Sequence, residues 1–89
     1  MNKKTIMMIN ILFFARLREV VGRESIQYQP SLDKLPTVKT VLEEIKIQFK
    51  QLNDEKNISA ALNQELLSDW NMPVKDGDEI AFFPPITGG

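Results

Sequence analysis

The sequence predicts one two-layer α+β domain, in which a long amphipathic helix packs across one face of a mixed β-sheet. The chain has 89 residues, 43% of them hydrophobic, which suits a single small domain with its own core. Its clearest periodic segment is a helix over residues 37–52. Two strand-like segments precede this helix and two follow it, so the order of elements fits a sheet crossed by one helix.

The composition excludes several classes of function. The chain carries 11 Lys and Arg against 12 Asp and Glu, a formal charge of −1, so no basic excess indicates binding to nucleic acid or to an anionic membrane. It has no cysteine, which excludes a disulfide scaffold, a thiolate nucleophile, a zinc ribbon and an iron–sulfur site. It has no histidine, the commonest general base and metal ligand. We therefore expect no conventional side-chain active site, no bound cofactor and no metal.

The N-terminal segment superficially resembles a secretion signal, because Lys3 and Lys4 precede an apolar run over residues 6–15. Asn10 interrupts this run, and no small-residue cleavage site follows before Arg16. The run is also too short to span a bilayer. A buried first strand is the favoured interpretation, and it implies a soluble cytoplasmic protein.

The first half of the chain predicts strand, short helix, strand. Residues 9–14 favour a central strand, since both of its faces are apolar over the second half. Residues 15–21 have the spacing of a short amphipathic helix, and Gly22 stands where a left-handed residue closes a helix. Residues 25–29 alternate as a half-exposed strand that would pair with the first.

The long helix has clear boundaries. Pro30 ends the second strand, residues 31–36 form a connection, and Thr37 is a good N-cap. Ile47 lies off the apolar stripe, and polar residues 53–57 end the helix. The stripe itself consists of Val38, Val41, Leu42, Ile45, Phe49 and Leu52.

The second half of the chain returns to strands. Residues 58–62 alternate as a third strand, the pair 63–64 suits a tight turn, and residues 66–67 begin a short return segment. Residues 68–74 are irregular, with Pro73 as a breaker.

The last strand is expected at residues 79–83, directly after the Asp-Gly-Asp turn at residues 76–78. The first and last strands are the most apolar, so we expect them to be central, adjacent and parallel. That is the β-grasp, or ubiquitin-like, arrangement. The domain would span residues 1–83, followed by an extended, flexible tail over residues 84–89.

The tail favours a chemical function. Pro84 has no N–H for a sheet ladder and restricts Phe83 to extended geometry, so the strand must stop there. Gly88 and Gly89 then end the sequence without side-chain bulk. One interpretation is an ordinary frayed terminus. The other is a slim arm that presents a terminal carboxylate in another protein's active site, where adenylation and then sulfuration would give a thiocarboxylate.

Three segments carry a resemblance to a known family. They are DGDEIAFFPPITGG at residues 76–89, ILFFARLRE at residues 11–19 and ALNQ at residues 61–64. On these segments the sequence resembles the small, sulfur-carrier subunits of molybdopterin synthase from about Met8 onward, and residues 1–7 would be a variable N-terminal extension.

This resemblance implies a mechanism. A ubiquitin-activating-enzyme-like adenylyltransferase would use ATP to adenylate the Gly89 carboxylate, which would then become a thiocarboxylate. The tail would thread through Gly88 into the large synthase subunit, in a heterotetramer of two small and two large subunits. There it would donate sulfur to cyclic pyranopterin monophosphate, and two transfers would build the molybdopterin dithiolene. The catalytic side chains would belong to the large subunit, and this chain would meet the pterin only in the complex.

A partner surface is expected on the sheet face that the long helix leaves uncovered. Leu12, Phe14 and whichever of Phe82 or Phe83 faces outward would share it. The alternative is that these side chains pack beneath residues 68–74, with Trp70 as their cover. The complete set of expected partner-binding residues is Leu12, Phe14, Phe82, Phe83, Pro84, Pro85, Ile86 and Thr87.

Two charged clusters have simpler explanations. The arginines at positions 16, 18 and 23 favour a solvated face over a partner site. Asp76, Asp78 and Glu79 favour turn chemistry over a metal site, because the ligand spacing of an EF-hand is absent. The sequence also has no GxxxxGK phosphate loop, so the activating enzyme would have to bind the ATP.

Other functions stay open at this point. A thiamine-type sulfur carrier and a modifier that tags lysines would share the fold and the Gly-Gly tail. A third possibility is an interaction module whose terminus is never activated.

Overall fold

The computed structural model describes residues 7–31 and 35–85. The expected N-terminal extension therefore falls almost wholly outside the described residues. The same holds for four predicted tail residues, Ile86, Thr87, Gly88 and Gly89.

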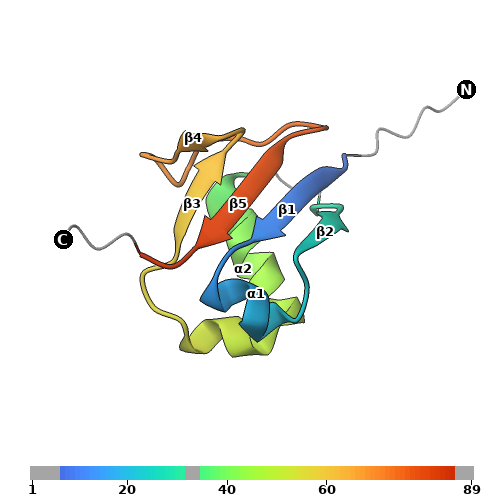
Figure 1. Ribbon diagram of the computed structural model, residues 1–89. Coiled ribbons are helices and arrows are strands. Elements are labelled where there is room, and N and C mark those ends of the chain that lie inside the picture. Colours follow the sequence, from blue (N-terminus) through green and yellow to red (C-terminus); the bar gives the residue numbers. More distant parts are fainter. Residues whose placement is uncertain (1–6, 32–34, 86–89) are drawn as a thin grey trace, which may run out of the picture.

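One five-stranded sheet forms the centre of the fold, with strand order β2-β1-β5-β3-β4 (Figure 1). β1 and β5 are parallel neighbours, and the other three pairs are antiparallel. This order confirms the predicted β-grasp arrangement. The elements are β1 (Ile9–Phe13), α1 (Arg16–Val21), β2 (Ser25–Tyr28), α2 (Val38–Gln48), the 3₁₀ helix η1 (Lys50–Asp54), β3 (Ser59–Leu62), β4 (Glu65–Leu66) and β5 (Glu79–Phe83).

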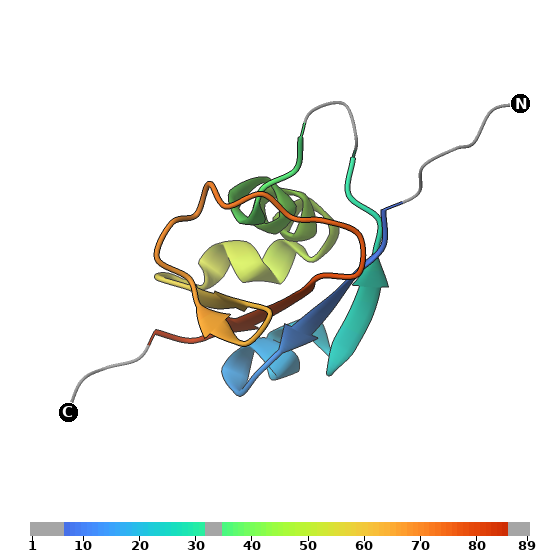
Figure 2. The ribbon, with the colours of Figure 1, turned by 90° about the horizontal axis from the view of Figure 1, so that it is seen from above.

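The core lies between the sheet and α2, which form the two layers visible from above in Figure 2. Strand alternation points every second side chain of β1 and β5 toward the helix. The ring of Phe13 packs there against Phe82 and, edge to face, against Phe49, with centroids 6.3 and 6.2 Å apart. The buried core comprises Ile9, Ile11, Phe13, Leu17, Val38, Val41, Ile45, Leu52, Ala60, Val74, Ile80 and Phe82.

The start of α2 is fixed by a capping box. The backbone N–H of Thr40 donates to Thr37 Oγ1 at 3.2 Å, and the N–H of Thr37 donates to Thr40 Oγ1 at 2.9 Å. Both N–H groups would otherwise lack an intrahelical partner. Ile47 is 73% exposed, as its position off the apolar stripe predicts.

The end of the long helix differs from the prediction. α2 ends at Gln48 and does not reach Leu52, because Phe49 leaves helical geometry and η1 follows. The amide of Asn53 donates to the carbonyls of Lys46 and Lys50, at 3.2 and 3.1 Å, and so satisfies groups that the helix end exposes. Leu52 still reaches the core, since the tighter turn of η1 directs it inward.

The irregular segment before β5 runs along the first turn of α2. The N–H of Lys39 donates to the Trp70 carbonyl at 2.9 Å, and that of Val38 to the Met72 carbonyl at 3.0 Å. Trp70 is partly buried against the core on this side. It is therefore not a cover for the opposite sheet face, and the alternative that placed Phe14 beneath this segment is wrong.

Two turns use left-handed backbone where the sequence predicts them. Gly22 closes α1 with φ 81°, and its N–H donates to the Arg18 carbonyl. Asn63 and Gln64 have φ 51° and 71°, the two positive values of a type I′ hairpin turn between β3 and β4.

Over residues 7–31 and 35–85, no helix is long and apolar enough to cross a membrane. The cytoplasmic location expected from the sequence stays a prediction.

Candidate functional site

The base of the tail is held firmly by the sheet. β5 is paired on both sides, with Ser59 of β3 opposite Phe83. The N–H of Phe14 donates to the carbonyl of Phe82 at 3.1 Å and so extends the parallel ladder by one residue beyond β1. Pro84 is half-buried and Pro85 is exposed. The chain therefore leaves the domain from a fixed point at the middle of the sheet.

The two phenylalanines of β5 have different environments. Phe82 is 1% exposed and lies in the core beneath α2, so it cannot contact a partner in the folded protein. Its expected place in the partner surface is wrong. Phe83 is half-buried and points to the opposite face, because successive side chains of a strand alternate.

The strand register brings apolar residues together on this opposite face. Leu12 of β1 lies beside Ala81 of β5, Ala81 lies beside Ala61 of β3, and Ala61 lies beside Leu66 of β4. Phe14 continues the alternation of β1 and is 41% exposed. We call these side chains the open-face patch: Leu12, Phe14, Ala61, Leu66, Ala81 and Phe83.

Three members of the patch, Ala61, Leu66 and Ala81, were not predicted from the sequence. Leu66 is 65% exposed, yet the sequence suggested only a short return segment there. The signal lay in the two-residue turn Asn63-Gln64, because a type I′ hairpin pairs residues at equal distances from the turn and so sets Leu66 opposite Ala61. For Ala81 the signal was the predicted parallel pairing of the first and last strands, which sets Ala81 beside Leu12.

Polar side chains bound the patch on the same face. Asn10 of β1 lies beside Gln27 of β2 on one side and beside Glu79 of β5 on the other, and Leu12 lies beside Ser25 of β2. The β2 edge and the start of β5 are thus polar, and Ser59 lies beside Phe83 on β3. Between them an apolar row crosses the sheet from β1 to β4, formed by Leu12, Ala81, Ala61 and Leu66. An apolar centre with a polar margin is typical of a protein docking surface.

The backbone turns sharply after Phe14. Ala15 has φ 53° and ψ −128°, a conformation that L-residues rarely adopt. Such a residue costs about 1–3 kcal/mol relative to relaxed backbone. The turn sends the chain into α1 at once and leaves Phe14 at the corner of the open-face patch.

The arginines near this corner are engaged within the chain. Arg16 Nε donates to the two carboxylate oxygens of Glu55, at 2.9 and 3.2 Å, and ties α1 to η1. This hydrogen bond, together with the negative charge of Glu55, raises the pKa of Arg16. Arg18 Nε donates to the Phe13 carbonyl at 3.3 Å. Arg23 is exposed, so the cluster combines intramolecular contacts with a solvated surface.

The acidic residues before β5 act as turn ligands for the chain itself. Asp78 accepts hydrogen bonds from the Asn63 side-chain amide at 3.0 Å and from the Lys75 N–H at 2.7 Å. Asp76 accepts one from the Met8 N–H at 2.9 Å. These contacts support the prediction of turn chemistry. Within the described part of the chain, no three or more acidic side chains are grouped so as to hold a metal ion.

The comparisons with known proteins agree with this geometry. Residues 11–89 match the model of the ThiS family. The chain is 42% identical over 86 residues to the molybdopterin synthase sulfur carrier subunit of Escherichia coli (strain K12), covering 92% of this chain and 100% of that one. It is 38% identical over 82 residues to the subunit of the same name from Haemophilus influenzae, with 92% and 100% covered.

A solved structure also matches. It is the complex of subunits 1 and 2 of the molybdopterin-converting factor from Helicobacter pylori, where one chain is 30% identical to this one. The match has a TM-score of 0.64 and covers 93% of this chain and 100% of that chain.

Proposed function

The chain belongs to the ThiS family, and from that premise we propose that it is the sulfur-carrier subunit of a molybdopterin synthase. One observation carries the proposal: the central strand β5, which borders an apolar open face, leads directly into a sequence with two prolines and then Gly-Gly. The strand fixes where the tail starts, the open face can bind a partner, and the glycines suit a narrow channel. The chain itself needs no catalytic side chain.

The reactive group in this proposal is the carboxyl group of Gly89. A free carboxylate is a poor acyl donor, because its charge repels nucleophiles and oxide is a poor leaving group. Attack of the carboxylate on the α-phosphate of ATP, held by a ubiquitin-activating-enzyme-like adenylyltransferase, releases pyrophosphate and forms an acyl adenylate. A sulfur donor at the oxidation level of sulfide then displaces AMP and leaves a thiocarboxylate at Gly89.

The open-face patch would dock this chain on the large synthase subunit. Its burial would remove the apolar surface of Phe14, Leu66 and Phe83 from water and so favour association. Pro84 and Pro85 restrict the backbone at the start of the tail, which lowers the entropy lost when the tail enters the partner. In a heterotetramer of two small and two large subunits, each tail would reach one active site.

Sulfur transfer would then occur in the large subunit. The thiocarboxylate sulfur attacks cyclic pyranopterin monophosphate, and hydrolysis returns Gly89 to a carboxylate. Two such transfers supply the two sulfurs of the molybdopterin dithiolene. Gly88 and Gly89 matter here because a Cβ at either position would widen the tail inside the channel.

The test is intact mass spectrometry of the chain after co-expression with its activating enzyme. We expect the mass increase that corresponds to one oxygen replaced by sulfur, located at Gly89 by fragmentation. A chain with one alanine appended after Gly89 should fold normally but show no increase. Absence of the mass shift in the unaltered chain, with an enzyme that modifies a known carrier in parallel, would refute the proposal.

A further inference from the structure

Hydrophobic surface is also exposed on the side of the molecule opposite the open-face patch. Of the large hydrophobic residues that are exposed in the described chain, Phe14 and Leu66 belong to the patch. Ile47 lies on α2 and is 73% exposed, and Met72 lies beside the first turn of α2 and is 42% exposed. The proposed sulfur transfer uses neither of these two residues.

A preformed groove lies next to this surface. It has a volume of about 440 Å³ and runs between α2 and the segment that contains Trp70. Leu42 and Trp70, both partly buried, supply its apolar lining. The lining residues are Lys39, Leu42, Glu43, Lys46, Trp70 and Asn71.

The wall that carries Trp70 is fixed by backbone hydrogen bonds. The Trp70 carbonyl accepts from Lys39 in α2, the Asn71 N–H donates to Asp69 Oδ1 at 2.9 Å, and the Met72 N–H donates to the Asp69 carbonyl at 3.1 Å. A groove with a fixed wall loses little entropy when a ligand enters it. Its shape is therefore suited to binding.

The charges at the groove point to an acidic ligand. Lys39 and Lys46 lie seven residues apart on α2, which places them about 10 Å apart along the helix axis. The one ion pair among the described residues joins Arg16 and Glu55, so neither ammonium group is neutralised at close range there. Glu43 lies between the two lysines, and its negative charge repels an acidic ligand. Neutralising Glu43 should therefore strengthen the binding of such a ligand.

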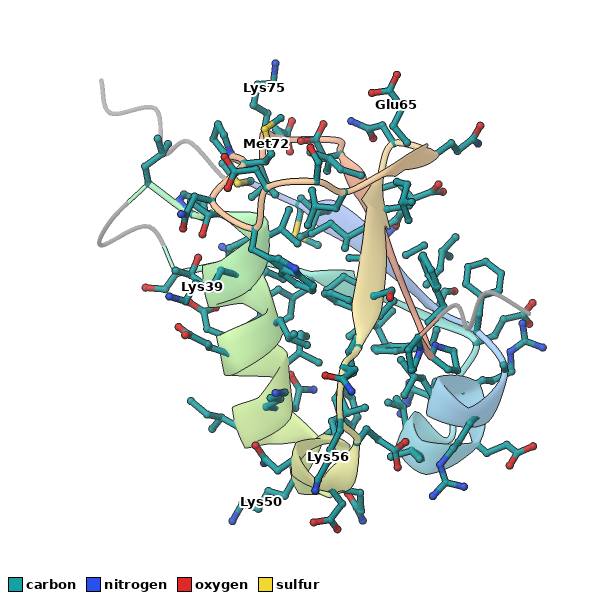
Figure 3. The ribbon with its side chains drawn as sticks, turned by 90° about the vertical axis from the view of Figure 1, so that its left-hand side faces the viewer. Lys39, Lys50, Lys56, Glu65, Met72 and Lys75 are labelled. Atoms are coloured by element: carbon teal, nitrogen blue, oxygen red, sulfur yellow. The ribbon has the colours of Figure 1, made fainter. Side chains whose placement is uncertain are left out.

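The positive surface continues along the helix. A second hollow of about 400 Å³ is lined by residues that include Lys46, Ile47 and Lys50. In Figure 3, which views the sheet and α2 edge-on, Lys39 lies near one end of α2 and Lys50 lies in η1 beyond the other end. The side thus combines a row of lysines with exposed apolar side chains.

We propose that the α2–Trp70 groove is a second protein-docking site, which binds an extended acidic segment of a partner. Two carboxylates four residues apart lie on the same side of an extended chain and span about 13 Å, a distance that the flexible side chains of Lys39 and Lys46 can bridge from their axial spacing of about 10 Å. An aliphatic residue midway between them, on the same side of the peptide, enters the groove over Leu42 and Trp70. Because this groove and the open-face patch lie on opposite layers, one partner can hold the chain here while another receives its tail.

Trp70 provides the measurement, since it is the only tryptophan in the chain. The probe is a capped synthetic peptide, Gly-Glu-Ser-Leu-Ser-Glu-Gly, titrated against the full chain while Trp70 fluorescence is recorded. We expect a saturable change with the acidic peptide and none with its counterpart Gly-Lys-Ser-Leu-Ser-Lys-Gly. The double variant Lys39→Glu, Lys46→Glu should weaken binding at least tenfold, and Glu43→Gln should strengthen it severalfold.

Matched variants separate this site from general electrostatics and from the sulfur-carrier function. Lys56→Glu with Lys75→Glu makes the same charge change away from the groove and should leave peptide affinity within twofold. Phe14→Asp alters the open-face patch and should also leave it unchanged, and thermal melting confirms that each variant folds. No saturable change, equal binding of the basic peptide, or loss of binding in Phe14→Asp would each overturn the proposal, whatever the fate of Gly89.

Discussion

The first residue of β5 is held by a hydrogen bond to a polar side chain, whereas its last residue, Phe83, lies on the open face between Phe14 and Ser59. The Asp78 carboxylate and the Asn63 amide tie the start of the strand to two neighbouring turns, and the Glu79 N–H donates to Asn63 Oδ1. At the exit end Phe83 is half-buried, and Pro84 begins the tail directly after it. One strand therefore has a structural end and a functional end, and substitutions at the two ends should have separable effects.

The largest expected effect is on docking at the exit end. We predict that Phe83→Asp weakens binding of the large subunit about 100-fold, or about 3 kcal/mol, because it places a charge within the apolar open-face patch. Binding would be measured by isothermal titration calorimetry. Gln27→Asp introduces the same charge on the polar margin of the same face and should change affinity less than about threefold. Equal losses in the two variants would remove the distinction between patch and margin.

A related test concerns Phe14. Phe14→Asp should weaken the large-subunit complex while leaving the thermal melting temperature nearly unchanged, because this side chain is 41% exposed. If Phe14 were instead a packing residue, stability would fall and affinity would not.

At the start of β5 we expect the reverse pattern. Asp78→Ala should lower the free energy of unfolding by about 2 kcal/mol, because the Asn63 amide and the Lys75 N–H lose their acceptor. Affinity for the large subunit, measured at a temperature where the variant is folded, should not change. Chemical denaturation measures the free energy of unfolding. A loss of affinity without a loss of stability would show that the start of β5 has no separate structural role.

A side-chain hydrogen bond that lies away from both ends of β5 should affect stability alone. The Tyr28 hydroxyl donates to Glu44 Oε1 at 2.6 Å, and burial together with this bond raises the pKa of Tyr28 above its usual value of 10.0. The unfolded chain would ionise first, so this contribution is present below about pH 10 and lost as the pH rises further. Tyr28→Phe should cost about 1 kcal/mol at neutral pH.

The check is denaturant unfolding of both proteins from about pH 8 to about pH 11. The stability difference between the two proteins should shrink above about pH 10. A constant difference across the range would show that the stabilisation by Tyr28 does not depend on the protonated hydroxyl.

The smallest expected effect concerns the turn at the exit end. Ala15→Gly should stabilise the fold by up to about 1 kcal/mol, because glycine adopts φ 53° without a Cβ clash. Thermal melting measures this gain. A loss of stability would show that the Ala15 methyl group contributes more by packing than its backbone strain costs.

Local signals carried most of the fold prediction. Alternation in β1, the glycine that closes α1 and the threonine cap of α2 each depend on a few adjacent residues, so their spacing alone was sufficient. The end of α2 was not predictable in this way. Phe49 and Leu52 fit the helical stripe as well as they fit a 3₁₀ turn, and the interactions that end the helix involve the Asn53 side chain.

The site was predicted less completely, because its faces depend on register. Phe82 and Phe83 are identical in type, and only the pairing with β1 and β3 decides which one is buried. Trp70 was misplaced because its segment is held by α2, about thirty positions earlier in the chain. The sequence indicated that a patch exists but could not assign every member to it.

The most direct test of sulfur donation by Gly89 is a single-turnover reaction. The chain in its thiocarboxylate form is mixed with the large subunit and cyclic pyranopterin monophosphate, and molybdopterin is quantified. We expect one molybdopterin for every two chains that lose their sulfur, with Gly89 returned to a carboxylate. Molybdopterin formed equally well from the unmodified carboxylate chain would contradict sulfur donation by Gly89.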